Sequence, residues 1–357
     1  MGTSKKYHYH VNILFSKDRE TFKGVERQES GYTGSKGNKD AFIFEPRKLS
    51  IQSYRRRQYE DGTILSNAKN ALNEQIIKGL LCYYALADDF PQIESISIVC
   101  KMSGASDYYY NECQVFENPI RTNVAVHRKF DSSVLPILLD VTAKAKAIRI
   151  SMSYWLKAAA TTDEYAKFDK LWRAFNCLYR YQSNSNKDIE GQRNMREFLL
   201  EHERDFNQTK DIVTAYTEDE LRNGFRWQRM ILNDYDNRRR TEALRDFVMR
   251  YSDGRIMRLL QEKLQCRRDF IAEENFTNDI DNHILQNQAT VSDMELVTFL
   301  AIKYAYFVRN KMVHGEVSDG TFKIGKDNLD NEMAKLNKIL EVLVFELISN
   351  HQLLRDA

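Results

Sequence analysis

The segment Tyr165–Tyr181 reads YAKFDKLWRAFNCLYRY and has the most regular apolar spacing in the chain. Its apolar side chains recur every three or four residues and form one stripe: Phe168, Leu171, Trp172, Phe175, Leu178 and Tyr179. This spacing predicts an amphipathic helix that buries one face in a hydrophobic core. Helical spacing continues on both sides, from about residue 132 to the C-terminus, and Pro136 is the one proline in that stretch.

The C-terminal part of the chain is therefore predicted to be helical. Further helices are expected over residues 135–160, 192–204, 218–233, 241–251, 254–271, 292–313 and 329–353. Asn186–Gly191 should end the helical pattern and connect two of these helices, and a short hairpin is expected at Val317–Ile324. Residues 131–357 are accordingly predicted to form one domain, an α-helical bundle.

The first 130 residues have a mixed pattern. Aromatic and β-branched residues predict strands at Tyr7–Phe15, Ala41–Phe44, Ile96–Cys100 and Tyr108–Phe116, the last two paired. Gly31–Lys39 resembles an exposed loop, and Asn67–Ala87 has the spacing of a helix that stops before Pro91. The expected fold class is mainly α, with a smaller α+β domain over residues 1–130 preceding the helical domain.

Composition narrows the functional classes. The 357 residues include 53 basic and 51 acidic ones, so net charge alone does not identify a nucleic-acid-binding protein. Five separated cysteines form no CxxC pair, and His8 and His10 lack an evident third ligand, so neither a disulfide framework nor a metal site is expected. Met1–Lys6 leads into no signal-like apolar region, and Leu340–Ile348 is too short to span a membrane. A cytoplasmic protein without membrane contact or cofactor is expected.

A polar group of side chains ends the helix predicted over residues 292–313. Arg309, Asn310 and His314 lie near its C-terminus, and Gly315 follows as a residue that can close a helix. Asn310 and His314 are four residues apart and share a face, so the amide could orient the imidazole. Arg309 lies about 100° around the helix but is long enough to reach the same side. Such a group suits a phosphodiester, because arginine binds phosphate and histidine transfers protons near neutral pH.

The spacing Arg309-Asn310-x-x-x-His314 resembles the signature of the HEPN family, in which an arginine precedes a histidine by four to six intervening residues. The segment Leu171–Tyr179 also resembles an earlier HEPN helix, in which an acidic or amide residue often faces the Arg/His pair. Asn176 occupies that position here. The resemblance covers the layout of residues 140–350, but only these two segments in sequence, and it implies a HEPN-like helical bundle.

The resemblance implies a metal-independent endoribonuclease. The 2′-hydroxyl of RNA would attack the phosphate and leave a 2′,3′-cyclic phosphate, at a composite site that two protomers of a homodimer complete. The site residues would be Arg309, Asn310, His314 and Asn176. By analogy the protein would be a toxin or antiphage-defence effector, with an activating ligand or partner, or oligomerisation, at residues 1–130. The alternatives are a non-catalytic HEPN-like module that binds RNA, a nucleotide or a protein, and a purely structural dimer.

Simpler interpretations of the same residues remain open. Arg121–His127 and Arg196–His202 also match the family pattern, with five intervening residues, so the bare pattern has little specificity. His314 could only cap its helix, with Arg309 in a surface ion pair. Asn176 could only hydrogen-bond a backbone carbonyl within the core.

Basic residues are concentrated between Arg222 and Arg268, where 13 basic residues accompany 6 acidic ones. A phosphate backbone is a natural partner for such a segment. The candidate RNA-binding residues are Arg226, Arg229, Arg238, Arg239 and Arg240. The alternative is a solvated helical surface whose charge is balanced by acids elsewhere, such as Glu218. A smaller basic cluster lies at Tyr54–Arg57.

Overall fold

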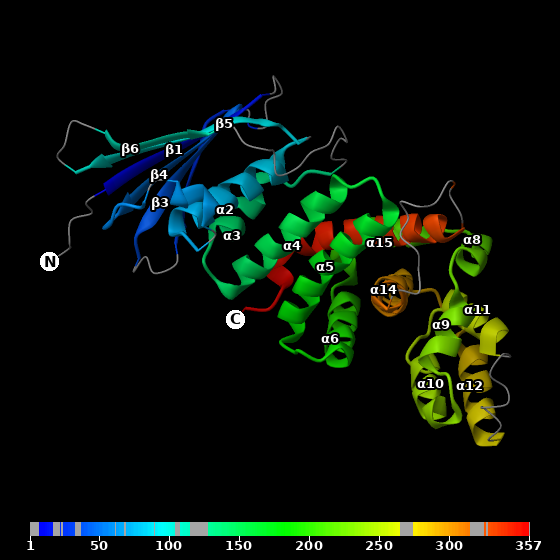
Figure 1. The fold of residues 1–357 in the computed structure, drawn as a ribbon. Helices are drawn as coiled ribbons and strands as arrows, with labels where there is room; N and C mark the ends of the chain where they lie inside the picture. Colours follow the sequence, from blue (N-terminus) through cyan, green and yellow to red (C-terminus); the bar gives the residue numbers. More distant parts are fainter. Residues whose placement is uncertain are drawn as a thin grey trace. The chain divides into compact units, whose positions relative to one another are not determined.

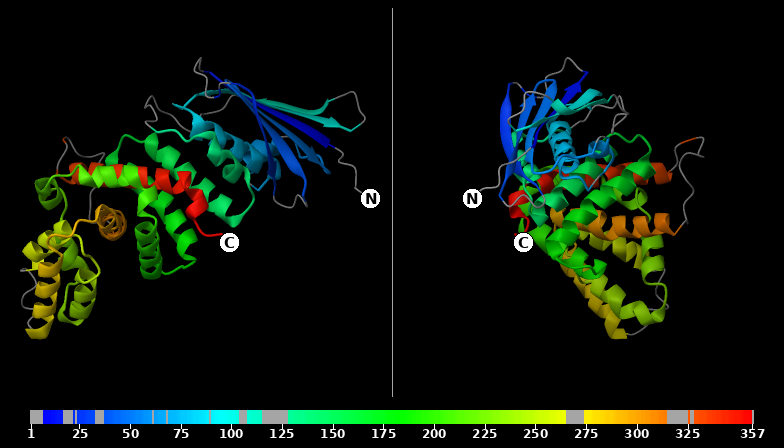
Figure 2. Two further views of the ribbon diagram at one scale, coloured as in Figure 1. Left: turned by 180° about the vertical axis from the view of Figure 1, so that it is seen from behind. Right: turned by 60° about the vertical axis from the view of Figure 1, so that its left-hand side comes forward.

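The computed structural model contains two compact units, which Figures 1 and 2 show in ribbon form. The structure describes residues 7–16, 22, 24–32, 37–60, 62–67, 69–88, 90–103, 108–114, 128–264, 274–314, 325 and 328–356. The first unit comprises residues 1–161 and 351–357, and the second comprises residues 162–350. The chain is mainly helical with an antiparallel sheet in the first unit, and the predicted fold class is confirmed at this level.

The first unit is built on one antiparallel sheet with the strand order β2-β3-β4-β1-β5-β6. Its strands are β1 (Tyr7–Phe15), β2 (Glu26–Gly31), β3 (Lys39–Glu45), β4 (Lys48–Arg55), β5 (Ile93–Met102) and β6 (Tyr108–Gln114). Tyr9, Val11 and Ile13 alternate along β1 and are fully buried, because successive strand residues point to opposite faces. The four predicted strands are confirmed as β1, β3, β5 and β6, whereas β2 and β4 were not predicted.

Helices pack against one face of this sheet (Figure 2). The helices of this unit are α1 (Thr63–Ser66), α2 (Ala71–Leu86), α3 (Leu135–Leu139) and α4 (Ala143–Ala159), with short 3-10 turns at Ser132–Val134 and His351–Leu353. Helices α2 and α3 contact the sheet, and α1 and α4 pack against α2. A Cβ atom on Gly79 of α2 would lie 2.7 Å from the Leu49 side chain, so glycine permits the close helix–sheet approach. Because α3 and α4 pack against α2, the compact units divide about 30 residues after the change in sequence pattern near residue 131.

The second unit is helical throughout its described residues. Its helices are α5 (Glu164–Ser183), α6 (Asp188–Glu201), α7 (Asn207–Thr214), α8 (Glu218–Asn223), α9 (Trp227–Asp234), α10 (Thr241–Val248), α11 (Gly254–Leu264), α12 (Glu274–Asn287), α13 (Asp293–Thr298), α14 (Ala305–Val313) and α15 (Asn328–Ser349). Short 3-10 turns span Glu203–Asp205 and Arg238–Arg240, and a π-helical turn, η5, spans Phe299–Tyr304. Helices α5 and α15 pack along each other and bury the apolar stripe of Tyr165–Tyr181.

Three details of the helix prediction were wrong. The predicted helix over residues 218–233 is two helices, because α8 ends at its C-cap Gly224 and α9 begins after Arg226. The predicted helix over residues 135–160 is two helices, because Asp140 accepts hydrogen bonds in the turn and Thr142 caps α4. Gly191 was expected to lie in a connection between helices, but it lies inside α6. A Cβ atom there would lie 2.9 Å from the Tyr179 ring, so this glycine allows α5 and α6 to approach closely. The expected hairpin at Val317–Ile324 lies outside the described residues.

None of the helices in the described ranges combines the length and the apolar character needed to cross a membrane.

Candidate active site

The candidate site lies at the end of a helical segment that runs from α13 through η5 to α14. Ser292 caps its start by accepting a hydrogen bond from the Glu295 backbone, and His314 is the C-cap residue. The helix predicted over residues 292–313 is confirmed, but its π-helical turn is a feature that apolar spacing does not reveal. Such turns often occur at functional sites, because the extra residue redirects the side chains that follow.

Arg309, Asn310 and Tyr306 form a hydrogen-bonded cluster on α14. Arg309 Nη1 donates to Asn310 Oδ1 over 3.0 Å, so the arginine does reach round to the side of the asparagine as expected. The Asn310 amide also hydrogen-bonds with the hydroxyl of Tyr306, four residues earlier on the same helix face. Arg309 and Asn310 are both half-buried, so the cluster is held in place and still reaches solvent.

Asp188, the first residue of α6, connects this cluster to α5. Its carboxylate accepts hydrogen bonds from Tyr306 (3.2 Å), Tyr179 (3.0 Å) and Arg180 (3.3 Å). A carboxylate at this position is favoured by the positive end of the α6 dipole. Burial raises the pKa of Tyr306 and Asp188 raises it further, while Asn310 and Arg309 lower it. The net rise keeps Tyr306 protonated and able to donate. Sequence reasoning missed Asp188, which lies in the expected break.

His314 stands apart from this cluster. Its side chain is exposed, and its backbone N–H donates to the Asn310 carbonyl over 3.1 Å, as a helix C-cap requires. Among the described residues none hydrogen-bonds to the imidazole. The Asn310 side chain, which was expected to orient the imidazole, instead contacts Arg309 and Tyr306.

Asn176 carries a buried carbonyl oxygen, Oδ1, without a hydrogen-bond partner in the described structure. Trp172 and Tyr179 flank it at helical spacing on the same face of α5. The Trp172 and Tyr306 ring centroids are 6.0 Å apart, and Tyr179 shares Asp188 with Tyr306. Asn176 therefore lies on the face of α5 nearest the α14 cluster, although no hydrogen bond in the described part of the chain joins it to Arg309, Asn310 or His314.

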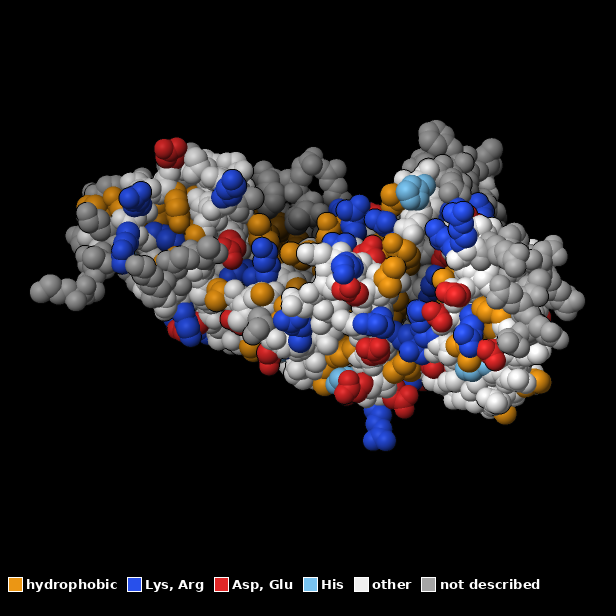
Figure 3. Space-filling view, turned by 90° about the horizontal axis from the view of Figure 1, so that it is seen from below, with side chains coloured by type: hydrophobic (Ala, Val, Ile, Leu, Met, Phe, Trp, Pro, Cys, Tyr) orange, Lys and Arg blue, Asp and Glu red, His pale blue; other side chains and the backbone are white. Residues whose placement is uncertain are grey.

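The five candidate RNA-binding arginines do not form one exposed group. Arg226 makes a largely buried ion pair with Glu332, with Nε 2.7 Å from Oε2. Arg229 and Arg239 are exposed, Arg240 is exposed and ion-pairs with Asp236, and the side chain of Arg238 lies outside the described structure. The face drawn in Figure 3 likewise shows basic and acidic side chains interspersed.

The neighbouring arginines are also paired. Glu218, named above as a possible balancing acid, lies near both Arg222 (3.1 Å) and Arg258 (3.5 Å). Arg245 pairs with Asp279 over 2.6 Å. The balanced-surface interpretation therefore describes much of this segment.

The competing Arg–His pair at Arg196–His202 has a structural role. Arg196 ion-pairs with the nearly buried Glu295 over 3.1 Å, and the His202 ring bonds to the Phe198 carbonyl over 2.9 Å. Arg121–His127 lies outside the described residues. In β1, His8 stacks on Tyr54, and the described residues contain no group of three possible metal ligands.

Comparisons with protein-family models, with curated proteins and with solved structures find no match to this chain.

Proposed function

We propose that the second unit of this chain carries a metal-independent endoribonuclease site of HEPN type. The observation that carries the proposal is the bonded pair of Arg309 and Asn310 at one helix end, one turn before the exposed His314. An arginine fork and an imidazole at one solvent-accessible site are the groups that phosphodiester cleavage by the RNA 2′-hydroxyl requires.

The proposed reaction is a transesterification. The 2′-oxygen forms a bond to phosphorus while the bond from phosphorus to the 5′-oxygen breaks, which leaves a 2′,3′-cyclic phosphate and a 5′-hydroxyl. His314 transfers a proton, either from the attacking hydroxyl or to the leaving oxygen. Arg309 stabilises the negative charge on the phosphate. Asn310 is a positioning residue, because it holds Arg309 and is itself held by Tyr306.

A homodimer would complete the site, with RNA bound where two protomers meet. One feature of the single chain supports this part of the proposal. The His314 ring is exposed and makes no hydrogen bond to a described residue. In biological terms we propose a cytoplasmic toxin or antiphage-defence effector, which predicts that expression arrests growth only when His314 is intact.

The direct test is cleavage of total RNA and tRNA by the full chain in excess EDTA. Arg309→Ala and His314→Ala should each slow cleavage by about 10²-fold or more, the usual scale for proton transfer and charge stabilisation. His202→Ala is the matched control, because it removes a histidine from the competing Arg–His spacing. His202→Ala should cleave like the parent. If Arg309→Ala or His314→Ala also cleaves like the parent, or if cleavage requires a divalent metal, the proposal is wrong.

Asn176→Leu separates a functional asparagine from a structural one. Leucine has nearly the same shape and removes the unpaired buried oxygen, so the variant should be as stable as the parent or more stable. If Asn176 serves the composite site, cleavage falls although stability does not. Unchanged cleavage would remove Asn176 from the site.

The second candidate is a non-catalytic module that binds RNA, a nucleotide or a protein. It is favoured by the lack of a described partner that would orient the His314 ring, since a proton-transfer histidine usually has its tautomer fixed by a hydrogen bond. This candidate predicts salt-dependent RNA binding that weakens in Arg309→Ala, with the RNA recovered intact.

A further inference from the structure

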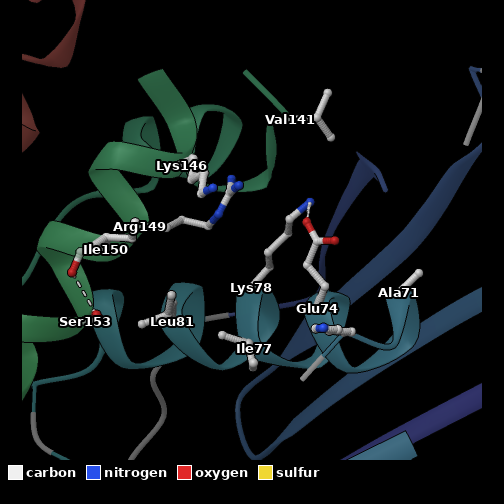
Figure 4. Close-up of a pocket in the computed structure, with 11 residues that line it drawn as sticks. Ala71, Glu74, Ile77, Lys78, Leu81, Val141, Lys146, Arg149, Ile150 and Ser153 are labelled. Atoms are coloured by element: carbon white, nitrogen blue, oxygen red, sulfur yellow. Dashed lines mark hydrogen bonds and ion pairs between the residues drawn. The ribbon is translucent and has the colours of Figure 1, made fainter. Parts of the chain in front are cut away.

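A cavity of about 590 Å³ lies between helices α2 and α4 in the first unit (Figure 4). Its volume falls in the range of small-molecule sites, roughly 300–1,000 Å³. Both helices contribute polar and apolar side chains to its walls. The cavity involves none of the residues proposed for RNA cleavage.

The cavity has a strongly basic lining. Four of its described lining residues are cationic and one is acidic: Lys69, Lys78, Lys146, Arg149 and Glu74. Figure 4 shows Lys78 and Glu74 projecting from α2, and Arg149 projecting from α4 into the same space. Three positive charges thus remain after Glu74 is subtracted. Like charges brought together in a partly dry cleft repel one another, so a bound anion would relieve that repulsion.

Lys78 is the most deeply placed of these cations, with a side chain only 1% exposed. Its ammonium group lies 3.4 Å from Glu74 and donates to the Gly31 carbonyl over 3.0 Å. Burial lowers the pKa of Lys78, and the nearby Arg149 lowers it further. Glu74 therefore compensates only part of the positive charge in the cavity, most directly that of Lys78.

Arg149 has hydrogen-bond donors that no described residue uses. Its Nη1 atom donates to the carbonyls of Leu138 (2.9 Å) and Asp140, which fixes the side chain at the start of α4. Its Nε and Nη2 groups make no hydrogen bond to a described residue. The exposed Lys146 lies one turn earlier on the same helix and forms no ion pair within the described structure. A fixed guanidinium beside a flexible lysine suits a phosphate group, whose oxygens can accept from both.

Most of the remaining lining residues are apolar, with Ser153 as the polar exception, and three of the apolar side chains are unusually exposed. Ile77, Val141 and Ile150 line the cavity with 46%, 56% and 38% of their surface accessible. Leu81 adds a fourth aliphatic side chain. Convergent charged groups beside an apolar surface are the usual composition of a site for an amphiphilic small molecule.

We propose that this cavity binds a phosphorylated small molecule, with its phosphate on Arg149 and Lys146 and its less polar part against Ile77 and Ile150. A mononucleotide has these two parts at suitable size. The site is independent of the proposed RNA cleavage, and its failure would leave that proposal untouched.

The test is calorimetric titration of the full chain with AMP and with pyrophosphate, beside adenosine as an uncharged probe. Both anions should bind saturably, AMP more tightly, whereas adenosine should not bind. Lys146→Glu should weaken AMP binding by about tenfold or more, the effect of losing one charge-assisted contact. Lys157→Glu makes the same charge change on an exposed lysine of α4 that does not line the cavity, so it should bind AMP like the parent.

Folding is checked by thermal unfolding of each variant, and Lys146 is chosen over Arg149 because Arg149 also holds two backbone carbonyls. No saturable binding of either anion up to about 10 mM, well beyond a millimolar dissociation constant, would overturn the proposal. Equal loss of AMP affinity in Lys146→Glu and Lys157→Glu would overturn it as well, because the binding would then reflect general charge and not this cavity.

Discussion

Replacing Arg226 with alanine should lower the free energy of unfolding by about 3–5 kcal/mol, the usual cost of removing one partner of a buried ion pair. Arg226 Nε donates to Glu332 Oε2 over 2.7 Å, and Nη2 donates to Oε1 over 3.1 Å. Glu332 is 2% exposed and also accepts a bond of 2.6 Å from the Tyr304 hydroxyl. The substitution leaves this carboxylate buried with Tyr304 as its remaining described partner.

The magnitude follows from the two lost bonds. A hydrogen bond to a charged group contributes about 1.5–3 kcal/mol, so two bonds give roughly 3–6 kcal/mol. The Arg226 side chain is 24% exposed, and water entering the gap would solvate Glu332 in part, which limits the expected loss to about 3–5 kcal/mol. Glu332→Gln should recover part of the loss in the double variant, because it removes the unpaired charge.

The assay is equilibrium urea unfolding of the parent, Arg226→Ala and Arg239→Ala. Arg239 is the matched control: an exposed arginine from the same basic segment, whose removal should change stability by less than about 0.5 kcal/mol. If Arg226→Ala unfolds within 1 kcal/mol of the parent but loses RNA affinity, the ion pair contributes little and Arg226 contacts RNA as the sequence first suggested. That result would refute the structural assignment.

Three further outcomes are expected. Gly254→Ala should destabilise by about 1–3 kcal/mol in urea unfolding, because the new Cβ would lie 2.2 Å from the Gln288 backbone oxygen. Glu346→Ala should lower the free energy of unfolding by about 2–3 kcal/mol, measured as a lower melting temperature. The Glu346 carboxylate accepts three hydrogen bonds at the start of α7, two of them from Thr209. Hydrogen bonds from Ser133 lower the pKa of Asp131, so its contribution to stability exists above the unfolded pKa and is lost as pH falls through the folded one. The stability difference between the parent and Asp131→Ala, measured by unfolding, should therefore be present at about pH 6 and vanish towards about pH 2.

Elements with a complete local pattern were predictable from the sequence. The apolar stripe of Tyr165–Tyr181 became α5, which runs from Glu164 to Ser183, and the alternation of Tyr7–Phe15 became β1 with the same ends. Strand β2 was missed because its sequence, ERQESG, has no apolar alternation, and it is held by pairing with β3 at the sheet edge. Helix α7 was missed because its N-terminus is held by Glu346, which lies nearly 140 residues away in sequence.

The contrast between local contacts and contacts made by distant residues also applies to the candidate site. The bond between Arg309 and Asn310 joins adjacent residues, so the sequence suggested it directly. Asp188 was hidden because it reaches Tyr306 only after the chain has folded across 118 positions. No count of spacings along a helix can reveal a partner that tertiary packing supplies. The spacing also suggested that Asn310 orients the His314 ring. In the folded chain the Asn310 side chain instead hydrogen-bonds with Tyr306 and Arg309, and the His314 ring is exposed.

Charge counted along the chain differs from charge available to a ligand. The segment from Arg222 to Arg268 has seven more basic than acidic residues, but Arg226 and Arg245 are neutralised by acids that lie outside the segment. The cations around the α2–α4 cavity do not form a basic cluster in the sequence. The fold brings four of them together, and Glu74 is the one acidic residue among the described residues that line the cavity. An anion responds to uncompensated charge at short range, because salt screens exposed charges beyond about 10 Å. A compact phosphate should therefore prefer the cavity, whereas RNA affinity at the arginine segment should depend on the few exposed side chains such as Arg239.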